Sequence, residues 1–383
     1  MHNANKRALV LMNLSAFFSG MVFYAPIATL YRQNRGISVW QMSVIEAISL
    51  VLMMALELPW GYIADRIGYR RTLMVSFSLL FISKIVFFGA TTFSIFLFER
   101  ILLAIALSAL SGVDIAYLHT CKATQKELGH YQGSMFLGLL AVALIFPLFR
   151  EVYIQSAFLT IITHLIALLF ILCLPRESHV ADESSLPKIS ILKTVTTLVY
   201  NKKLLLYVGA NAVLFGVNQV VTIFLVQLCY ARVGIALSMF ALPFLLLVIT
   251  STCLSYLSAP LVTRFGAFPL TVGAFMLACI GLILLSSLHD SVVVIFGSVL
   301  IRIGATLVQP LYFSVTAKVS EGSDLATSLS LNSLLGTCIE LLLTLVLGFW
   351  AERNLALSLQ GAGVALIGAL VALYFSRSLI RGS

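Results

Sequence analysis

Charged residues are scarce in this sequence, and their scarcity excludes a water-soluble protein. Only 10% of the 383 residues are charged, whereas 60% are hydrophobic. A soluble domain carries about 25% charged residues, so this chain could not cover a water-facing surface. The long apolar runs are typical of membrane-spanning helices and are far longer than barrel strands. The sequence therefore predicts an integral membrane protein.

Several chemical signatures are missing as well. The 6 cysteines lack the spacing of a zinc site or a disulfide framework. The sequence contains no nucleotide-binding loop. It also contains no His-Glu-x-x-His motif and no Ser/His/Asp grouping that would indicate an enzyme. We therefore expect no metal, no cofactor and no catalytic residue. Any process at the membrane that needs energy would draw on an ion gradient. A membrane-bound receptor or enzyme stays only as a remote alternative, because the chain has no sizeable soluble domain.

Each membrane span needs about 20 apolar residues, and twelve such runs fit the chain. Their approximate limits are 8–31, 39–62, 72–90, 94–117, 131–149, 157–174, 204–229, 237–258, 269–288, 292–317, 325–350 and 357–375. The first run is too long for a signal-peptide core and is expected to remain as a span. The predicted fold class is all-α integral membrane, with 12 transmembrane helices in two six-helix bundles.

Lysine and arginine are concentrated in the connections on the side that holds both termini. Basic connections stay in the cytoplasm, so the sequence predicts cytoplasmic termini and a multi-pass protein of the plasma or inner cell membrane. The formal net charge of +9 is then mostly an orientation signal. Nucleic acid is therefore not an expected partner.

A polar segment at about 175–203 divides the chain. After Pro187, apolar residues fall on one face with lysines between them, which predicts a short amphipathic helix on the inner leaflet. A tether between two bundles is favoured over a regulatory site. The predicted domains are an N-terminal bundle at 1–174, a cytoplasmic linker at 175–203 and a C-terminal bundle at 204–383.

The most specific motif lies between the second and third runs. Residues 61–71 are Gly-Tyr-Ile-Ala-Asp-Arg-Ile-Gly-Tyr-Arg-Arg, which we expect to form a short turn with a glycine at each end. The stretch resembles the signature loop of the major facilitator superfamily, in which Gly, three residues, Asp-Arg, one residue and Gly precede usually basic positions. The matching residues are Gly61, Asp65, Arg66, Gly68, Arg70 and Arg71, with Tyr69 where a basic residue is commoner.

The resemblance implies a secondary transporter whose two bundles rock around a central cavity, so that it opens to each side in turn. It also implies that Asp65 and its arginines brace the cytoplasmic helix ends when the cavity faces outward. The expected partner of Asp65 is the start of the eleventh span, near Ser323 and Asp324.

A weak copy of the signature follows the eighth run. In Ala-Pro-Leu-Val-Thr-Arg-Phe-Gly-Ala, which starts at residue 259, Arg264 and Gly266 correspond to Arg66 and Gly68. Thr263 replaces the acid. The copy falls where a six-plus-six duplication would place it.

Ionisable residues inside the spans are functional candidates, because a charge at mid-bilayer costs at least about 2.5–3.5 kcal/mol. Arg100 is similar to the arginine of the superfamily's fourth-span motif, although Leu103 and Ala104 replace its Gln and Gly. The resemblance implies a role in proton coupling, and an internal salt bridge is the alternative. Glu46 lies at a depth comparable with Lys84, so a structural ion pair is weighed against a proton site.

Glu340 ranks first among the proton carriers, because it lies deep in the eleventh run, which contains no lysine or arginine. A buried acid of this kind suits reversible proton binding. The proton-coupling candidates are Glu340, Glu46, Asp114 and Arg100. The isolated His164 is expected to be a packed hydrogen-bonding residue rather than a relay.

Polar stripes at helical spacing mark the first, fourth, seventh and tenth runs. In the superfamily these four spans line the central cavity. The candidates for the cavity and the substrate site are Asn13, Phe17, Tyr24, Asn211, Asn218, Thr222, Arg302, Thr306 and Gln309. Hydrogen bonding between helices, without substrate contact, is the alternative for each amide.

Proton-coupled efflux of a lipophilic or cationic small molecule, such as a drug or a metabolite, is the first choice of function. Proton-coupled uptake of a small organic solute is the alternative. The fifth run retains only Pro147 of the glycine-rich motif that proton-driven drug antiporters of the superfamily carry. The expected partners are the substrate and the lipid bilayer, with the protein as a monomer.

Overall fold

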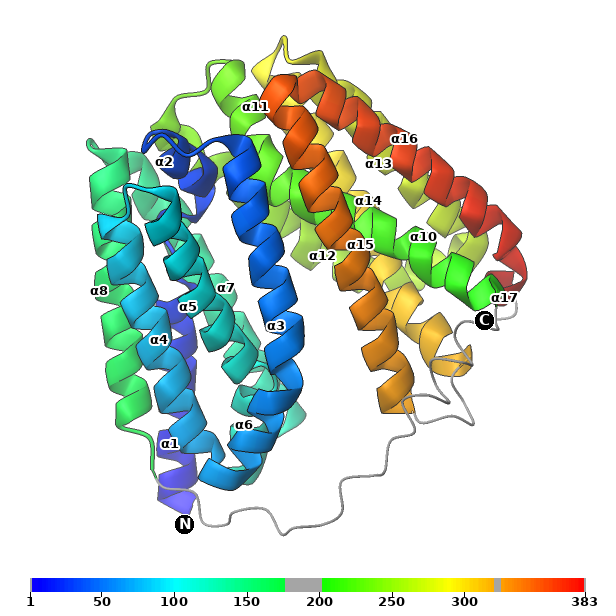
Figure 1. Ribbon diagram of the computed structural model, residues 1–383. Helices are drawn as coiled ribbons and strands as arrows, with labels where there is room; N and C mark the ends of the chain where they lie inside the picture. The colour runs from blue at the N-terminus through cyan, green and yellow to red at the C-terminus, as the bar shows by residue number, and fades with distance from the viewer. Residues whose placement is uncertain (1, 176–201, 320–324, 382–383) are drawn as a thin grey trace. The chain divides into compact units, whose positions relative to one another are not determined.

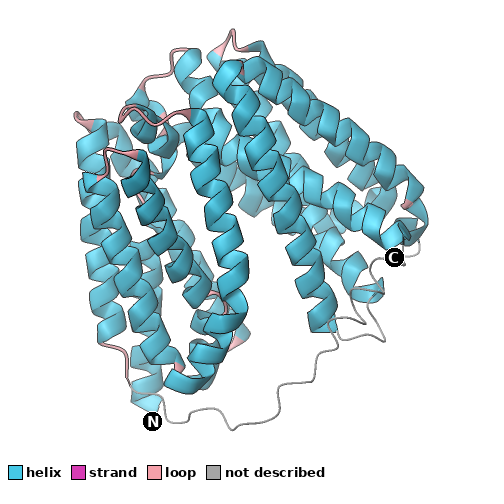
Figure 2. Cartoon of the chain, viewed as in Figure 1, coloured by secondary structure: helices cyan, strands magenta, loops and turns pink. Residues whose placement is uncertain are grey.

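The computed structural model describes residues 2–175, 202–319 and 325–381, which form helices joined by short connections (Figure 2). The predicted amphipathic helix of the linker lies outside these residues.

The helices of the first half are labelled in Figure 1. The α-helices are α1 (His2–Gly20), α2 (Ala28–Gln33), α3 (Val39–Ile67), α4 (Tyr69–Gly89), α5 (Phe93–Leu110), α6 (Val113–Thr120), α7 (Gln125–Ile145) and α8 (Val152–Leu172). Two 3-10 turns, η1 (Ala25–Ile27) and η2 (Phe146–Leu148), complete this half.

The second half has longer uninterrupted helices. Its α-helices are α10 (Lys202–Gln219), α11 (Val226–Arg232), α12 (Ala241–Phe265), α13 (Ala267–Ser287), α14 (Ser291–Val319), α15 (Leu325–Arg353), α16 (Leu355–Phe375) and α17 (Arg377–Arg381). Between them lie the π-helical segment η3 (Val220–Leu225) and the 3-10 turn η4 (Leu237–Met239).

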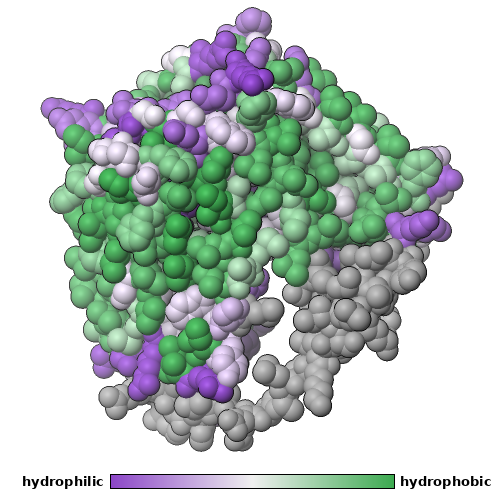
Figure 3. All heavy atoms as spheres, in the orientation of Figure 1, coloured by the Kyte–Doolittle hydropathy of each residue, from purple (hydrophilic) through white to green (hydrophobic). Residues whose placement is uncertain are grey.

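In the described residues, 12 helical stretches are long and apolar enough to cross a membrane. They follow the order of the predicted runs, so the all-α membrane fold with twelve spans is confirmed. One boundary matters for function: the first span continues to Gln33 and therefore includes Arg32. Apolar side chains cover the flanks of the helices, and hydrophilic ones gather near their ends (Figure 3).

The chain divides into two compact units. The first comprises Met1–Ile37, Val44–Ser184 and Leu237–Leu245, and the second comprises Ser38–Ser43, Ser185–Ala236 and Leu246–Ser383. In the first unit, α1 packs against α7 and α8, while α4 packs against α5 and α8. In the second unit, α13 packs against α14 and α16, and α10 packs against α15 and α16.

Glycines bring α1 and α7 into backbone contact. A Cβ atom added at Gly20 would lie 2.4 Å from the carbonyl oxygen of Met135, and one added at Gly138 would lie 2.2 Å from that of Phe17. The two helices can approach this closely only because neither position carries a side chain. Other glycines join α13 to α14 in the same way in the second unit.

The first span is interrupted. α1 ends at Gly20, and residues 21–24 are not helical before η1 and α2 continue the span (Figure 1). The backbone N–H of Phe23 donates to Oγ1 of Thr160 at 2.9 Å. The hydroxyl of Thr163 donates to the carbonyl of Met21 at 3.0 Å. Non-helical backbone inside a membrane needs such partners, so two threonines of α8 hold the break in the first span.

The seventh span is interrupted at the corresponding place. There α10 widens into the π-helical segment η3 before α11 continues the span. The breaks at 21–24 and 220–225 lie nearly as far apart in the sequence as Gly68 and Gly266 of the two signature copies. The two halves therefore depart from α-helical geometry at comparable positions.

The prediction of a turn across the whole signature stretch is wrong. α3 continues through Gly61 to Ile67, and only Gly68 separates it from α4. Gly68 has a φ of 91°, in a region that other residues rarely adopt, and Gly266 in the second copy has a φ of 84°. The two copies therefore share one backbone turn, and it needs a single glycine.

Gly68→Ala is expected to destabilise the protein by about 1–3 kcal/mol, because alanine is strained at this φ. Gly61→Ala is the matched control, because it lies within a helix and a Cβ there would meet nothing within 4 Å. Alanine at residue 61 should be neutral or stabilise by up to about 1 kcal/mol. Melting temperatures of the two purified variants in one detergent measure the difference. Equal melting temperatures would contradict the role given to Gly68.

Candidate functional site

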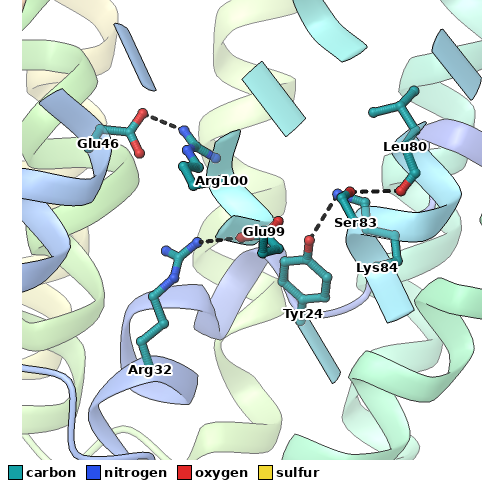
Figure 4. A network of polar contacts seen from close by, with 8 residues as sticks. All are labelled: Tyr24, Arg32, Glu46, Leu80, Ser83, Lys84, Glu99 and Arg100. Atoms are coloured by element: carbon teal, nitrogen blue, oxygen red, sulfur yellow. Dashed lines mark hydrogen bonds and ion pairs between the residues drawn. The ribbon is translucent and has the colours of Figure 1, made fainter. Parts of the chain in front are cut away.

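Five charged side chains gather in the first unit, close to the break in the first span (Figure 4). They come from the four helices α2, α3, α4 and α5. The residues are Arg32, Glu46, Lys84, Glu99 and Arg100. We call this group the N-terminal charge cluster. It contains three cations and two acids.

Glu46 and Arg100 form an ion pair between α3 and α5. The guanidinium of Arg100 donates to Oε1 of Glu46. Both side chains remain partly exposed, Glu46 to 37% and Arg100 to 20%. This contact is the internal salt bridge weighed for Arg100. Pairing of Glu46 with Lys84, inferred from their similar depth, is wrong.

Glu99 and Arg32 form a second and looser pair between α5 and α2. Nη2 of Arg32 lies 3.9 Å from Oε2 of Glu99, whose side chain is fully buried. Neither carboxylate oxygen of Glu99 has a hydrogen-bond partner, and neither does Nε of Arg32. Buried polar atoms without partners are rare and call for an explanation.

The sequence pattern does not indicate this second pair. The first apolar run ends at Tyr31, which places Arg32 in a connection. The sequence feature that could indicate such a pair is the acid Glu99 directly before Arg100. Residues that are adjacent in a helix point about 100° apart, so an acid and a base there can each reach a different neighbouring helix.

Lys84 is the fifth charged residue of the cluster and takes part in neither ion pair. Its ammonium donates to the hydroxyl of Tyr24 at 3.0 Å (Figure 4). Both residues are buried, with Lys84 4% and Tyr24 6% exposed. The Tyr24 ring stacks on Phe87 at a centroid distance of 4.0 Å, and Tyr31 stacks on the same ring at 4.6 Å. The break in the first span therefore places a predicted cavity residue against a buried cation.

The other acid predicted in the fourth span lies apart from Arg100. The span is interrupted at Gly112, which has a φ of 77°, and Asp114 stands in the first turn of α6. It accepts hydrogen bonds from the hydroxyl of Tyr131 at 3.0 Å and from the backbone of Ile115 at 2.8 Å. Its role as a proton carrier stays a prediction.

The signature residues make contacts within the first unit. The hydroxyl of Tyr69 donates to Asp65 at 3.3 Å, so a phenol takes the position where a basic residue is commoner. Arg70 donates to the carbonyl of Leu174 at 2.7 Å and therefore caps the end of α8. Ser323 and Asp324, the expected partners of Asp65, lie outside the described residues. The gating role of the stretch stays a prediction.

The predicted residues of the second unit are divided between its interior and its surface. Arg302 donates to the hydroxyl of Ser251 at 2.6 Å, and Thr222 donates to the carbonyl of Asn218 at 2.7 Å. Asn211 and Thr306 are buried, whereas Gln309 is exposed. Convergence of these residues on a central cavity with Asn13, Phe17 and Tyr24 stays a prediction.

Glu340 is half-buried in α15. A Cβ atom added at Gly216 of α10 would lie 3.4 Å from its Cα atom. The glycine thus brings the seventh span against the eleventh at the acid. His164 is buried, and Nδ1 of its ring lies 2.9 Å from the carbonyl oxygen of Thr160, which fits the expected hydrogen-bonding role.

Residues 9–339 match the family profile of the Major Facilitator Superfamily, and the chain belongs to this family. None of the curated proteins matches the sequence. Among solved structures, the chain is similar to the nucleoside transporter NupG, with a TM-score of 0.78, 12% identity and coverage of 98% of this chain and 99% of that one.

Two further solved structures share the fold. A D-xylose-proton symporter has a TM-score of 0.72 and 14% identity, with 96% of this chain and 97% of that one covered. A POT family transporter in complex with a thioalcohol-conjugated peptide has a TM-score of 0.76 and 15% identity, with 97% and 96% covered. Identities this low indicate the fold alone. With the family, they define the chain as a secondary transporter of the membrane.

Proposed function

We propose that this transporter is coupled to protons through the Glu46–Arg100 pair. The observation that carries the proposal is the pair itself, an acid and a base in neighbouring spans that are both partly open. Arginine does not lose its proton in proteins, so the exchangeable proton belongs to the acid. Of the two acids in the N-terminal charge cluster, Glu46 is the one that solvent can reach.

Protonation of Glu46 would remove the negative charge that holds Arg100. The guanidinium would then turn to Glu99, the other acid within its electrostatic range. Such a change of partner alters the contact between α3 and α5, which is the differential interaction that coupling requires. Glu340 and Asp114 remain alternative carriers, and the proton gradient is the proposed energy source, without a cofactor.

Direction follows from the charge of the cluster. It has one more cation than acids, so a proton on Glu46 makes it more positive. A proton and an anion would then favour each other's binding, whereas a proton and a cation would oppose it. We therefore place proton-coupled uptake of an organic solute ahead of efflux, which was the first choice on sequence grounds.

Proteoliposomes with an imposed pH gradient test this function. Uptake predicts accumulation of solute on the alkaline side, and efflux by exchange for protons predicts accumulation on the acidic side. A protonophore should abolish either. Glu46→Gln is expected to lose gradient-driven accumulation while it retains solute counterflow, because counterflow needs no net proton movement. Glu340→Gln is the parallel variant. Accumulation by Glu46→Gln equal to that of the wild type would overturn the assignment of Glu46.

A further inference from the structure

Lys84 carries a positive charge that the described part of the protein does not balance. The acids of the cluster pair with other residues, Glu46 with Arg100 and Glu99 with Arg32. No carboxylate of the described residues lies within ion-pair distance of the Lys84 ammonium, which donates only to the Tyr24 hydroxyl. A buried ammonium without a counter-charge costs several kcal/mol, so its retention in a membrane span indicates a function.

The other titratable groups that the structure records beside Lys84 do not balance its charge. They are Tyr24 and His164 of α8, and an imidazole is either neutral or cationic. The Tyr24 hydroxyl accepts the hydrogen bond from Lys84 and retains its own O–H for donation. Lys84 and Tyr24 therefore present two donor groups at one position, and no carboxylate of the described residues forms an ion pair with the ammonium.

Aromatic rings form one wall beside these donors. Phe87 stacks on Tyr24 and on Tyr31, and it meets Phe96 edge to face at a centroid distance of 5.7 Å. Phe87 and Phe96 are fully buried. Such a wall favours an apolar or aromatic ligand body.

The break in the first span allows Tyr24 to move, so that a ligand could reach this position. Tyr24 is the last residue of the non-helical stretch, which two threonine hydroxyls of α8 hold. Displacement of Tyr24 would break side-chain hydrogen bonds and ring stacking without melting a helix. Unwound stretches of this kind form the substrate sites of repeat-built transporters.

We propose that Lys84 and Tyr24 bind the carboxylate of an organic anion whose aromatic or lipophilic body packs on Phe87. Two hydrogen bonds, one from the ammonium and one from the phenol, hold the carboxylate. The ligand supplies the charge that the cluster lacks. This inference rests on the proposed transport function and adds the class of its substrate.

Matched aromatic ligands that differ only in charge test the proposal. Aromatic carboxylates of one to three rings, each with its neutral amide and its amine, are titrated against the purified protein by thermal shift and calorimetry. At least one carboxylate should bind about tenfold or more tightly than its own amide and amine. Only the carboxylate can accept a hydrogen bond from the Lys84 ammonium as an oppositely charged partner. Tighter binding of the amines or amides, or no binding by any carboxylate, would overturn it.

Variants then locate the site. Lys84→Met should weaken carboxylate binding by about tenfold or more, and Tyr24→Phe by about threefold to tenfold. Lys84→Arg should retain part of the affinity, which separates the charge from the shape of the residue. Lys202→Met, at an exposed lysine that begins α10, is the matched control. Gel filtration verifies folding, and full affinity in folded Lys84→Met would overturn the site.

The proposed transport function and this site can fail separately. Carboxylate binding that depends on Lys84, without proton-driven accumulation of any ligand, would refute the transport function alone. Proton-driven transport that is unaffected in Lys84→Met would refute the anion site alone.

Discussion

Arg100→Met is expected to reduce proton-driven accumulation about a hundredfold. The substitution leaves Glu46 without its cation inside a membrane span, where an unpaired charge costs at least about 2.5–3.5 kcal/mol, which corresponds to about a hundredfold. On the proposed mechanism, it also removes the group that would respond to protonation of Glu46. Initial rates of accumulation in proteoliposomes, normalised to reconstituted protein, measure the loss.

A second variant separates folding from coupling. Arg100→Met combined with Glu46→Gln leaves no stranded charge, so its melting temperature should return towards that of the wild type while accumulation stays low. Arg232→Met is the matched control, because Arg232 is an exposed arginine in the last turn of α11 and is not among the candidate site residues. Wild-type accumulation by folded Arg100→Met would refute the coupling role.

Composition and the lengths of the apolar runs predicted most of the fold. The order of the twelve spans follows from apolar content alone, because a bilayer demands about 20 apolar residues for each helix. The signature stretch shows where this reasoning ends. Gly61 and Gly68 have the same side chain, but one continues a helix and the other takes a positive φ. The sequence shows where a glycine allows a positive φ, but it does not show whether the backbone adopts one there.

The partners in the charge cluster were less predictable, because depth along a span does not give direction around it. Lys84 and Glu46 have similar depths, yet Glu46 contacts Arg100 and Lys84 contacts Tyr24. The interruption after Gly20 turns the end of the first span, so Arg32 reaches the buried Glu99. A helical projection that assumes one straight span cannot find this contact.

The charge cluster also connects direction with substrate class. Efflux of a cation and uptake of an anion place opposite demands on the same residues. A cation would be favoured by an excess of acids, because opposite charges attract. This cluster has an excess of cations, and protonation of Glu46 increases it. The proposed uptake of an anion with a proton is therefore consistent with the charges of the described cluster.

Gly138→Ala is expected to destabilise the protein strongly. The added methyl carbon would lie 2.2 Å from the carbonyl oxygen of Phe17 and 3.2 Å from the carbonyl carbon of Gly20. Backbone atoms cannot move aside as a flexible side chain can, so α1 and α7 must separate next to the break in the first span. We expect a loss of about 3 kcal/mol or more, at or above the upper end of overpacking costs.

Gly133→Ala is the matched control on the same helix. A Cβ atom there would meet nothing within 4 Å, so the substitution should be neutral or stabilise α7 by up to about 1 kcal/mol. Melting temperatures and gel-filtration profiles of the two variants in one detergent give the comparison. If Gly138→Ala melted at the temperature of Gly133→Ala, the close contact between α1 and α7 would not be what holds the broken span in place. If it melts far lower, the loss should extend to transport, since the contact lies directly before the break that leads to Tyr24 and to Arg32 of the charge cluster.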